Sequence, residues 1–482
     1  MTEPTPHPHS HTGLAQRFGA NYRWRVLLTV MIGTMASIMA STIINVAVPD
    51  ISRVFHLGQA RAQWLSAGFM AAMTLSMLTT PWLLQRFGYR HTYVGVVTLL
   101  LAGGVIGGLS HWFELVLAMR VAEGLAAGVL QPIPAIIIMK AFGDHERGKA
   151  MGIFGFGVVL APAIGPSVGG VLIEWFGWRS IFFVVVPFCL AALVMARRYL
   201  PITTPDGTPA NRDGARLDVV GLVLIAIAVL SLLNGMVALH GAATGMGTSA
   251  GWALLACSAT ALIGFYFHQR RGAEPLMELG LFGHRNFALG GVVAFIYGMA
   301  LFGSTYLVPV FMQIALALPP SQAGAALLPA GFVLALTIPV AGRLTDRLPF
   351  GRIVGFGLSL LAASFLLMVT VGPASSLWWI VSWAVIGRIG LGFVLPSLNV
   401  GAMRGLPDGF ISQGASTINF MRQLGGAVGI SLVGIVLEWR LQVRVGDPVR
   451  AFHETFVLVG FITACAVIAA LQMGAPRAPT SS

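Results

Sequence analysis

Long apolar runs alternate with short polar breaks along nearly the whole chain. The apolar runs are about twenty residues long, which is the length that an α-helix needs to cross the hydrocarbon core of a membrane. They are too long and too uniformly apolar for the alternating strands of a membrane β-barrel. The pattern predicts fourteen membrane-spanning helices, at 25–48, 62–84, 92–110, 113–140, 149–173, 180–199, 218–239, 250–268, 287–313, 322–343, 352–371, 377–402, 412–438 and 453–473.

Composition excludes an ordinary soluble protein. Hydrophobic residues make up 56% of the 482 residues and charged residues only 10%, whereas soluble domains carry roughly 25% charged residues. Because lipid offers the backbone no hydrogen-bond partners, we expect an all-α protein that crosses the membrane many times. Cys189, Cys257 and Cys465 all lie in apolar runs, so we expect neither disulfides nor a metal site.

The net charge of +12 follows the positive-inside rule and does not indicate nucleic-acid binding. Basic residues gather in alternate loops, which we place in the cytoplasm: Arg86, Arg90, Lys140, Arg147, Lys149, Arg197, Arg198, Arg270, Arg271, Arg343, Arg347 and Arg352. The opposite loops hold fewer basic residues, with the segment 440–450 as an exception. This assignment places both termini in the cytoplasm.

The two halves of the chain resemble each other. The polar loop at 83–90 has a counterpart at 342–352, and Arg120 of the fourth predicted helix has a counterpart in Arg388 of the twelfth. Transporters are commonly built from such repeats. We therefore predict a disordered cytoplasmic tail, a six-helix bundle, loops with two linker helices, a second six-helix bundle and a cytoplasmic tail, at 1–24, 25–200, 201–286, 287–473 and 474–482.

A stripe of small residues runs along the fifth predicted helix, at Gly157, Ala161, Gly165 and Gly169. Such a stripe lets a neighbouring helix approach to backbone contact. Pro162 and Pro166 lie beside it, and each removes a backbone donor and bends the helix. The pattern indicates either a tightly packed membrane helix of any kind or a helix that rocks against its neighbours.

This segment resembles the antiporter motif of the fourteen-helix drug:proton antiporter-2 family (EmrB/QacA type) of the major facilitator superfamily. The motif positions are held by Gly152, Gly165, Pro166, Gly169 and Gly170, and Ala161 replaces a glycine. Stretches at 41–49, 177–187, 217–221, 274–287 and 419–429 are similar to the same family. The resemblance covers nearly the whole chain. It implies a major facilitator fold and proton-driven export across a bacterial inner membrane, with no cofactor.

The paired polar loops resemble the cytoplasmic motif of the superfamily, whose charges bridge helix ends while the cytoplasmic side is shut. The candidate latch residues are Arg86, Gly88 and Arg90 in the first copy and Gly342, Asp346, Arg347, Gly351 and Arg352 in the second. The first copy departs from the motif, with Pro81 for the glycine and Gln85 for the aspartate. We therefore expect the stronger latch in the second copy. The alternative is a solvated, positively charged loop.

Ionisable residues inside the spans are functional candidates because charges in a membrane are costly. These are Arg120, Glu123, Arg388 and Arg422, and Glu123 is the only acid well inside a predicted span. Burial disfavours the ionised carboxylate, whereas the neighbouring Arg120 favours it. A change of surroundings could therefore load and unload a proton. The alternative is a static pair in which Glu123 only neutralises Arg120.

The family resemblance bears on this pair. Arg120 matches an arginine that the family ties to proton transfer, and Glu123 stands where relatives more often have glutamine. Relatives carry an acid at the position of Ala40, just before the stretch 41–49. Its absence either shifts proton handling to Glu123 or alters the coupling.

Substrate contacts are expected from two kinds of residue inside the spans. Flexible Met and aromatic side chains suit a promiscuous pocket, although they also serve ordinary helix packing. Polar side chains in lipid should face a cavity or another helix. The candidates are Met39, Asn45, Phe69, Met73, Gln131, Gln313, Asn399, Asn419, Arg422 and Gln423.

No nucleotide-binding loop, metal cluster or nucleophile constellation is present in the sequence, which argues against a primary pump and most enzymes. The leading hypothesis is a secondary exporter that exchanges protons for small amphipathic compounds. The alternatives are a transporter of one metabolite, self-made antibiotic or lipid, and a binding or sensory protein without coupling. We expect a monomer in the bilayer with no nucleic-acid partner. A periplasmic adaptor is less expected, because the family members that use one have a longer loop than 440–451.

Overall fold

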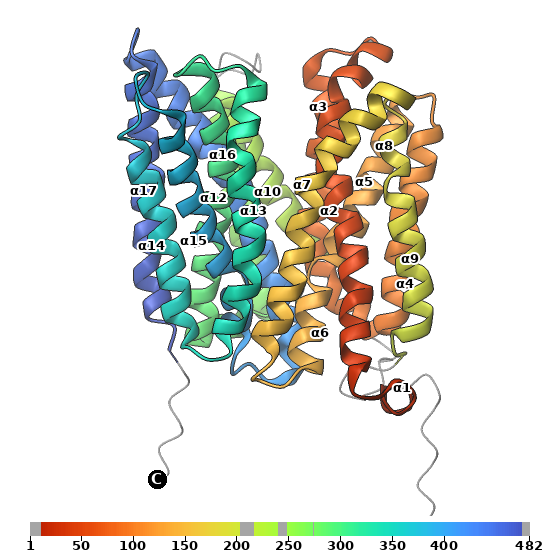
Figure 1. Ribbon diagram of the computed structural model, residues 1–482. Coiled ribbons are helices and arrows are strands. Elements are labelled where there is room, and N and C mark those ends of the chain that lie inside the picture. Colours follow the sequence, from red (N-terminus) through yellow and green to blue (C-terminus); the bar gives the residue numbers. More distant parts are fainter. Residues whose placement is uncertain (1–10, 203–215, 240–247, 273, 475–482) are drawn as a thin grey trace, which may run out of the picture. The chain divides into compact units, whose positions relative to one another are not determined.

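The computed structural model describes residues 11–202, 216–239, 248–272 and 274–474. Within these ranges the chain forms helices and turns and no strand, which confirms the all-helical prediction (Figure 1). The chain divides into two compact units. The first comprises 1–150, 154–218 and 408–416, and the second comprises 151–153, 219–407 and 417–482.

The helices up to residue 199 belong to the first unit, apart from 151–153. They are α1 (His11–Phe18), η1 (Gly19–Asn21), α2 (Tyr22–Val54), α3 (Gln59–Ser76), η2 (Met77–Thr79), α4 (Thr80–Leu109), α5 (Phe113–Leu130), α6 (Ile133–Ala141), α7 (Arg147–Phe176), α8 (Ser180–Phe183) and α9 (Val185–Tyr199).

The later helices belong to the second unit, apart from η4 (Asp408–Phe410) and the first turns of α16. They are α10 (Val219–Ala238), α11 (Thr248–Arg271), η3 (Leu279–Gly283), α12 (Arg285–Ile314), α13 (Pro320–Thr345), α14 (Phe350–Met368), α15 (Leu377–Met403), α16 (Ile411–Val443) and α17 (Pro448–Leu471). The predicted linker helices correspond to α10 and α11, which pack against each other; Ser258 Oγ donates to Ala228 O at 2.7 Å.

The described residues contain 12 helices that are long and apolar enough to cross a membrane. The chain is therefore a polytopic helical protein, but this number does not confirm the predicted fourteen spans. One of the 12 helices runs over Arg61–Leu109 and has 49 residues. At 1.5 Å per residue it would measure about 74 Å, more than twice the roughly 30 Å of a bilayer core.

Gly88 divides this long segment. The sequence predicts a polar loop there, but the structure continues as helix on both sides of a kink at Gly88, whose φ is 76° and ψ 171°. This positive φ is accessible to glycine and strained for other residues. The kink therefore separates two helical stretches without a connecting loop.

Prolines explain two further differences from the predicted spans. The predicted helix 113–140 is split into α5, which ends at Leu130, and α6; the predicted helix 180–199 is split after Phe183. A proline clashes with the carbonyl four residues earlier and removes one backbone hydrogen bond. Pro134 and Pro187 each stand four residues after the point at which the preceding helix ends.

The chain ends differ in part from the predicted tails. Residues 1–10 and 475–482 lie outside the described residues, whereas His11–Phe18 forms a helix and α2 already begins at Tyr22. The Tyr22 hydroxyl donates to Tyr199 O at 2.9 Å, so the start of α2 is tied to the end of α9.

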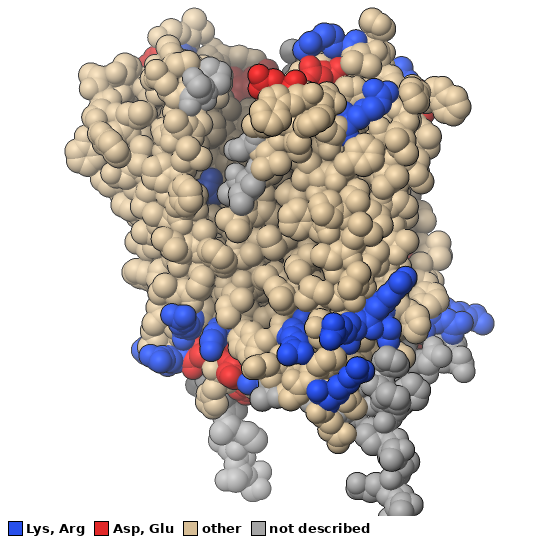
Figure 2. Space-filling view, turned by 45° about the vertical axis from the view of Figure 1, so that its right-hand side comes forward, with Lys and Arg blue, Asp and Glu red and all other residues tan. Residues whose placement is uncertain are grey.

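The helices pack through glycines. A Cβ on Gly124 would lie 2.4 Å from Phe69 O, and a Cβ on Gly128 would lie 2.1 Å from Met73 O, so α5 touches the backbone of α3. On the face shown in Figure 2, uncharged side chains cover the middle of the helices and most charged side chains lie near the helix ends. This arrangement is typical of a protein whose middle section is in lipid.

Gly128→Ala tests the backbone contact between α3 and α5. We expect it to lower the thermal unfolding temperature, because overpacking of a close contact costs about 1–3 kcal/mol and exceeds the helix propensity that alanine gains. Gly95→Ala in α4 is the control, since no atom lies within 4 Å of a Cβ there. Equal unfolding temperatures of the two variants in one detergent would contradict the contact.

Candidate functional site

Arg120 and Glu123 form a buried ion pair on α5. The side chains are only 2% and 1% exposed, and Arg120 Nη1 lies 2.5 Å from Glu123 Oε2. Arg120 Nε donates to Leu65 O at 3.3 Å, and its Cζ lies 4.3 Å from the centre of the Phe69 ring. The spacing of three residues places both charges on one face of the helix, as the sequence predicts, and α3 supplies the other contacts of Arg120.

A small void adjoins the pair. It has about 180 Å³ of empty volume, including the part open to the outside, and is lined by residues of α2, α5, α8 and α9: Ala40, Ile43, Ile44, Arg120, Glu123, Ile181, Phe182 and Val185. Glu123 Oε1 and Arg120 Nη2 are buried and have no hydrogen-bond partner. A carboxylate and a guanidinium can form two parallel bonds, but here half of that capacity is unused.

Two glycines on α4 make room for the carboxylate. A Cβ on Gly103 would lie 2.6 Å from Glu123 Cγ, and a Cβ on Gly104 would lie 3.4 Å from Glu123 Oε1. The GGVIGG stretch at 103–108 has the spacing of close helix contact. This stretch was missed as part of the site, although its glycine pattern is visible in the sequence.

The ten predicted cavity residues are distributed between the units. In the first unit, Met39, Phe69 and Met73 are buried, and Phe69 lies beneath the guanidinium of Arg120. Asn45 is exposed and its Oδ1 accepts from Ser66 Oγ at 2.8 Å. Gln131 is partly exposed at the end of α5. None of these five lines the void beside Glu123.

In the second unit, Gln313 is exposed, whereas Asn399, Asn419 and Gln423 are buried. Asn399 Nδ2 donates to Leu395 O of its own helix at 3.1 Å. Arg422 Nη2 donates to Asn419 Oδ1 at 2.9 Å, so two of the predicted residues are joined by a hydrogen bond within α16.

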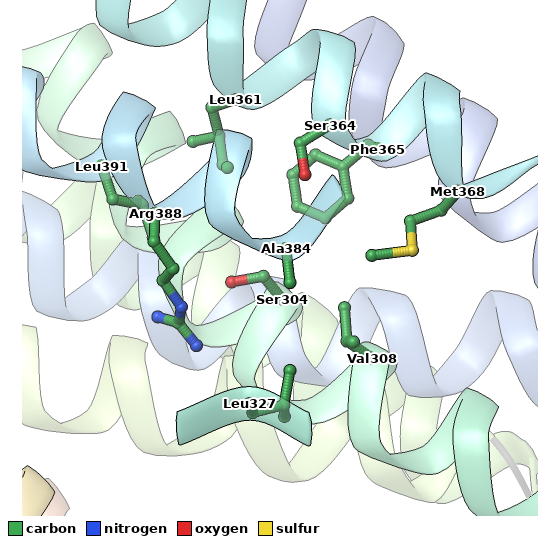
Figure 3. Close-up of a pocket in the computed structure, with 11 residues that line it drawn as sticks. Ser304, Val308, Leu327, Leu361, Ser364, Phe365, Met368, Ala384, Arg388 and Leu391 are labelled. Carbon is green, nitrogen blue, oxygen red and sulfur yellow. The ribbon is translucent and has the colours of Figure 1, made fainter. Parts of the chain in front are cut away.

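A larger cavity lies among α12, α13, α14 and α15 of the second unit. It has about 390 Å³ of empty volume, including the part open to the outside, and is lined by Ser304, Val308, Leu327, Leu361, Ser364, Phe365, Met368, Ala384, Gly387, Arg388 and Leu391. Figure 3 shows the Arg388 side chain extending from α15 into this group of mostly apolar residues. Sequence reasoning identified Arg388 as a charge within a span but missed the cavity, because its walls come from four separate helices.

The small-residue stripe of α7 packs against α2. A Cβ on Gly157 would lie 2.6 Å from Met31 Sδ, one on Gly165 3.2 Å from Thr42 Oγ1, and one on Gly169 2.6 Å from Ile43 Cγ1. Ala161 and Gly152 are buried, whereas Gly170 faces open space. Pro162 and Pro166 belong to α7, but their side chains lie outside the described part.

The latch candidates lie at helix junctions. Arg86 and Arg90 are partly buried on either side of Gly88. In the second copy, Gly342 is buried, Asp346 caps α13, and Arg347 and Arg352 are exposed. A Cβ on Gly351 would lie 2.2 Å from Met473 O, so the start of α14 is in backbone contact with the chain just after α17.

Comparison with known proteins shows the family. A profile of the Major Facilitator Superfamily matches residues 30–430. The tetracenomycin C resistance and export protein of Streptomyces glaucescens is 29% identical over 455 residues, which cover 94% of this chain and 82% of that protein. A multidrug resistance protein B homolog of Mycobacterium tuberculosis is 30% identical over 424 residues, covering 86% of this chain and 77% of the relative.

The fold agrees with this result. The crystal structure of the human organic anion transporter MFSD10 aligns with a TM-score of 0.67 and 15% identity, covering 93% of this chain and 99% of that structure. At this identity the likeness concerns the fold alone. With its many apolar helices and the match over 30–430, the chain is a multi-pass membrane transporter and belongs to the Major Facilitator Superfamily.

Proposed function

We propose that this protein is a proton-coupled exporter of small amphipathic compounds that works by alternating access. The observation that carries the proposal is the buried Arg120–Glu123 pair, in which one carboxylate oxygen has no hydrogen-bond partner beside an apolar void. The names of the two relatives, one an export protein and one a multidrug resistance protein homolog, support export. The proton gradient supplies the energy, without a metal or cofactor.

The pair has the properties of a proton carrier. Protonation of Glu123 removes the charge attraction to Arg120, whose remaining contacts are Leu65 O and the face of Phe69. The void gives the neutral carboxyl group space to turn away from Arg120, while the glycines of α4 stay in contact with the Glu123 side chain. A change in water access then decides whether the acid holds its proton. A purely static pair would be better served by two parallel hydrogen bonds, and the structure has one.

Ala40 supports the assignment of Glu123. The family resemblance places an acid at this position, and in this chain Ala40 lines the same void as Glu123. We infer that the carboxylate of Glu123 lies in the space that the acid of the relatives occupies. In this proposal the residue that binds the proton lies on α5 and not on α2.

The proposed topology has fourteen spans, of the antiporter-2 type, in a bacterial inner membrane with both termini in the cytoplasm. The 49-residue segment Arg61–Leu109 is long enough for two spans divided at Gly88. The 30-residue α7 supplies a further span, in addition to the 12 apolar helices. The stripe of α7 would then slide on α2, and the motif around Asp346 would close the cytoplasmic side. The protein works as a monomer.

Transport of one specific solute is the second candidate. The relative from Streptomyces glaucescens is named for a single compound, whereas the relative from Mycobacterium tuberculosis is a multidrug resistance protein homolog. The range of compounds accepted by this chain separates the two candidates, and both use the same coupling pair.

Glu123→Gln should abolish proton-driven accumulation. In inverted vesicles with an acidified lumen, we expect uptake of lipophilic dyes, cationic and neutral, to fall at least tenfold, because the amide cannot bind or release a proton at this position. Dye counterflow without a gradient should persist, since it requires only the conformational change. Glu114→Gln is the matched control on the same helix, because the Glu114 side chain is 73% exposed and pairs with Arg61.

Loss of one partner from a buried pair is itself destabilising, by about 3–5 kcal/mol. The double variant Arg120→Gln/Glu123→Gln removes both charges and should show the same split, with counterflow retained and accumulation lost. Full accumulation by either variant would place the coupling elsewhere. Wild-type uptake of no dye at all would favour the single-solute candidate.

Ala40→Asp should partly restore accumulation in the Glu123→Gln background. The side chain of residue 40 lines the void that holds the carboxylate, so an acid introduced there reaches the same space. We expect at least threefold more gradient-driven uptake than in Glu123→Gln alone. Ala40→Asn in the same background has the same size without the acid and should restore nothing. Equal uptake by the Asp and Asn variants would refute the shared role of the two positions.

A further inference from the structure

Arg388 is a positive charge near the middle of α15 without a negative partner. In the described part of the chain it is partly exposed and makes no ion pair and no hydrogen bond, and its electrostatic neighbour is Tyr297, a phenol that is uncharged at neutral pH. Arg120 of the first unit, by contrast, has Glu123 at 2.5 Å. The two arginines occupy matching places in the sequence repeat but differ in charge compensation.

Within the second unit, the helices around the cavity carry no acid that could pair with Arg388. The four helices that line its cavity, α12 to α15, contain no Asp or Glu between their first and last residues. The acid in the first turns of α17, Glu454, is held by Arg444 at 2.7 Å. A guanidinium in an apolar setting requires a counter-charge, and the neighbouring helices do not provide one.

The cavity has two chemically different sides. In Figure 3 the Arg388 guanidinium lies at one side and Met368 with Val308 at the opposite side, and the ring of Phe365 lies between them. The apolar wall suits the body of a small organic molecule. A guanidinium is a fork of N–H donors that matches a carboxylate in two parallel bonds.

Two serine hydroxyls add hydrogen-bond acceptors to the cavity. Ser364 Oγ donates to Trp383 O at 2.7 Å, and Ser304 Oγ donates to Leu301 O at 2.9 Å. Because both hydroxyl hydrogens are already used, these oxygens face the cavity as acceptors. Arg388 therefore supplies the donors for an anionic group, and the serines accept from a neutral O–H or N–H of the same ligand.

We propose that the cavity among α12, α13, α14 and α15 is a binding site for amphipathic organic anions, with the carboxylate or ionised phenol on Arg388 and the apolar body along Phe365 and Met368. The inference rests on the proposed export function and adds amphipathic anions to the cationic and neutral compounds of its substrate class. The cavity is partly open to the outside, and its empty volume of about 390 Å³ counts that open part. The ligand provides the negative charge that α12 to α15 lack.

Matched acids and amides test the charge requirement. We would titrate the purified full-length protein in detergent with 2-naphthoate, 1-hydroxy-2-naphthoate and indole-3-acetate, and with the primary amide of each, by calorimetry. The wild type should bind at least one acid ten or more times tighter than its amide. Arg388→Gln should remove this preference by weakening the acid at least tenfold while leaving the amide unchanged. Arg285→Gln, an exposed arginine at the start of α12, should behave like the wild type.

Arg388→Lys is a second variant that keeps the test valid if Arg388→Gln does not fold. It retains the charge but lacks the fork of donors, so we expect the preference for the acid to fall at least threefold without disappearing. The proposal is overturned if the wild type binds no acid, if acid and amide bind equally, or if both Arg388 variants keep the full preference.

The proposed export and the anion site can fail separately. Glu123→Gln should retain the acid preference, because its carboxylate lines a different void in the first unit. If neutral dyes are taken up with the gradient but acid and amide bind equally, the proposed export function stands and the anion site is refuted. If acid binding depends on Arg388 but no proton-driven transport is found, the anion site stands and the proposed export function is refuted.

Discussion

The structure depends on close backbone contact between helices, because lipid gives two apolar helices little reason to associate through hydrophobic burial. Glycines provide this contact at several places. A Cβ on Gly298 of α12 would lie 1.9 Å from Arg422 O, and one on Gly128 would lie 2.1 Å from Met73 O. The glycines of α4 leave the space that Glu123 fills. The buried pair is therefore a consequence of how closely α4 and α5 can pack.

The two units differ in how an arginine within a helix is compensated. Arg120 is paired with an acid of its own helix, Glu123. Arg388 has no such partner and lines the larger cavity. The two proposals together have an electrical consequence. Each cycle would export one monovalent anion and import one proton, which together transfer two positive charges into the cell. A membrane potential of 100 mV then contributes about 4.6 kcal/mol to the cycle. An inside-negative membrane would drive such a cycle strongly.

Most of the helical architecture was predictable from the chain itself. Apolar runs of the right length identified the helices because a membrane leaves the backbone no other hydrogen-bond partners than its own. The details at Gly88, Pro134 and Pro187 were missed. Hydropathy averages over a window, whereas a kink or break depends on the backbone freedom of one glycine or the missing N–H of one proline.

The site was predictable only as far as it lies on one helix. The three-residue spacing of Arg120 and Glu123 determined by itself that the two charges share a face, since helical geometry fixes neighbours one turn apart. Which residues surround them was decided by the tertiary structure: Ala40 comes from α2 and Phe182 from α8. Arg388 was visible in the sequence as a costly charge, but its lack of a partner was not. That property depends on which side chains the packing of four helices brings within reach, and helical spacing carries no information about them.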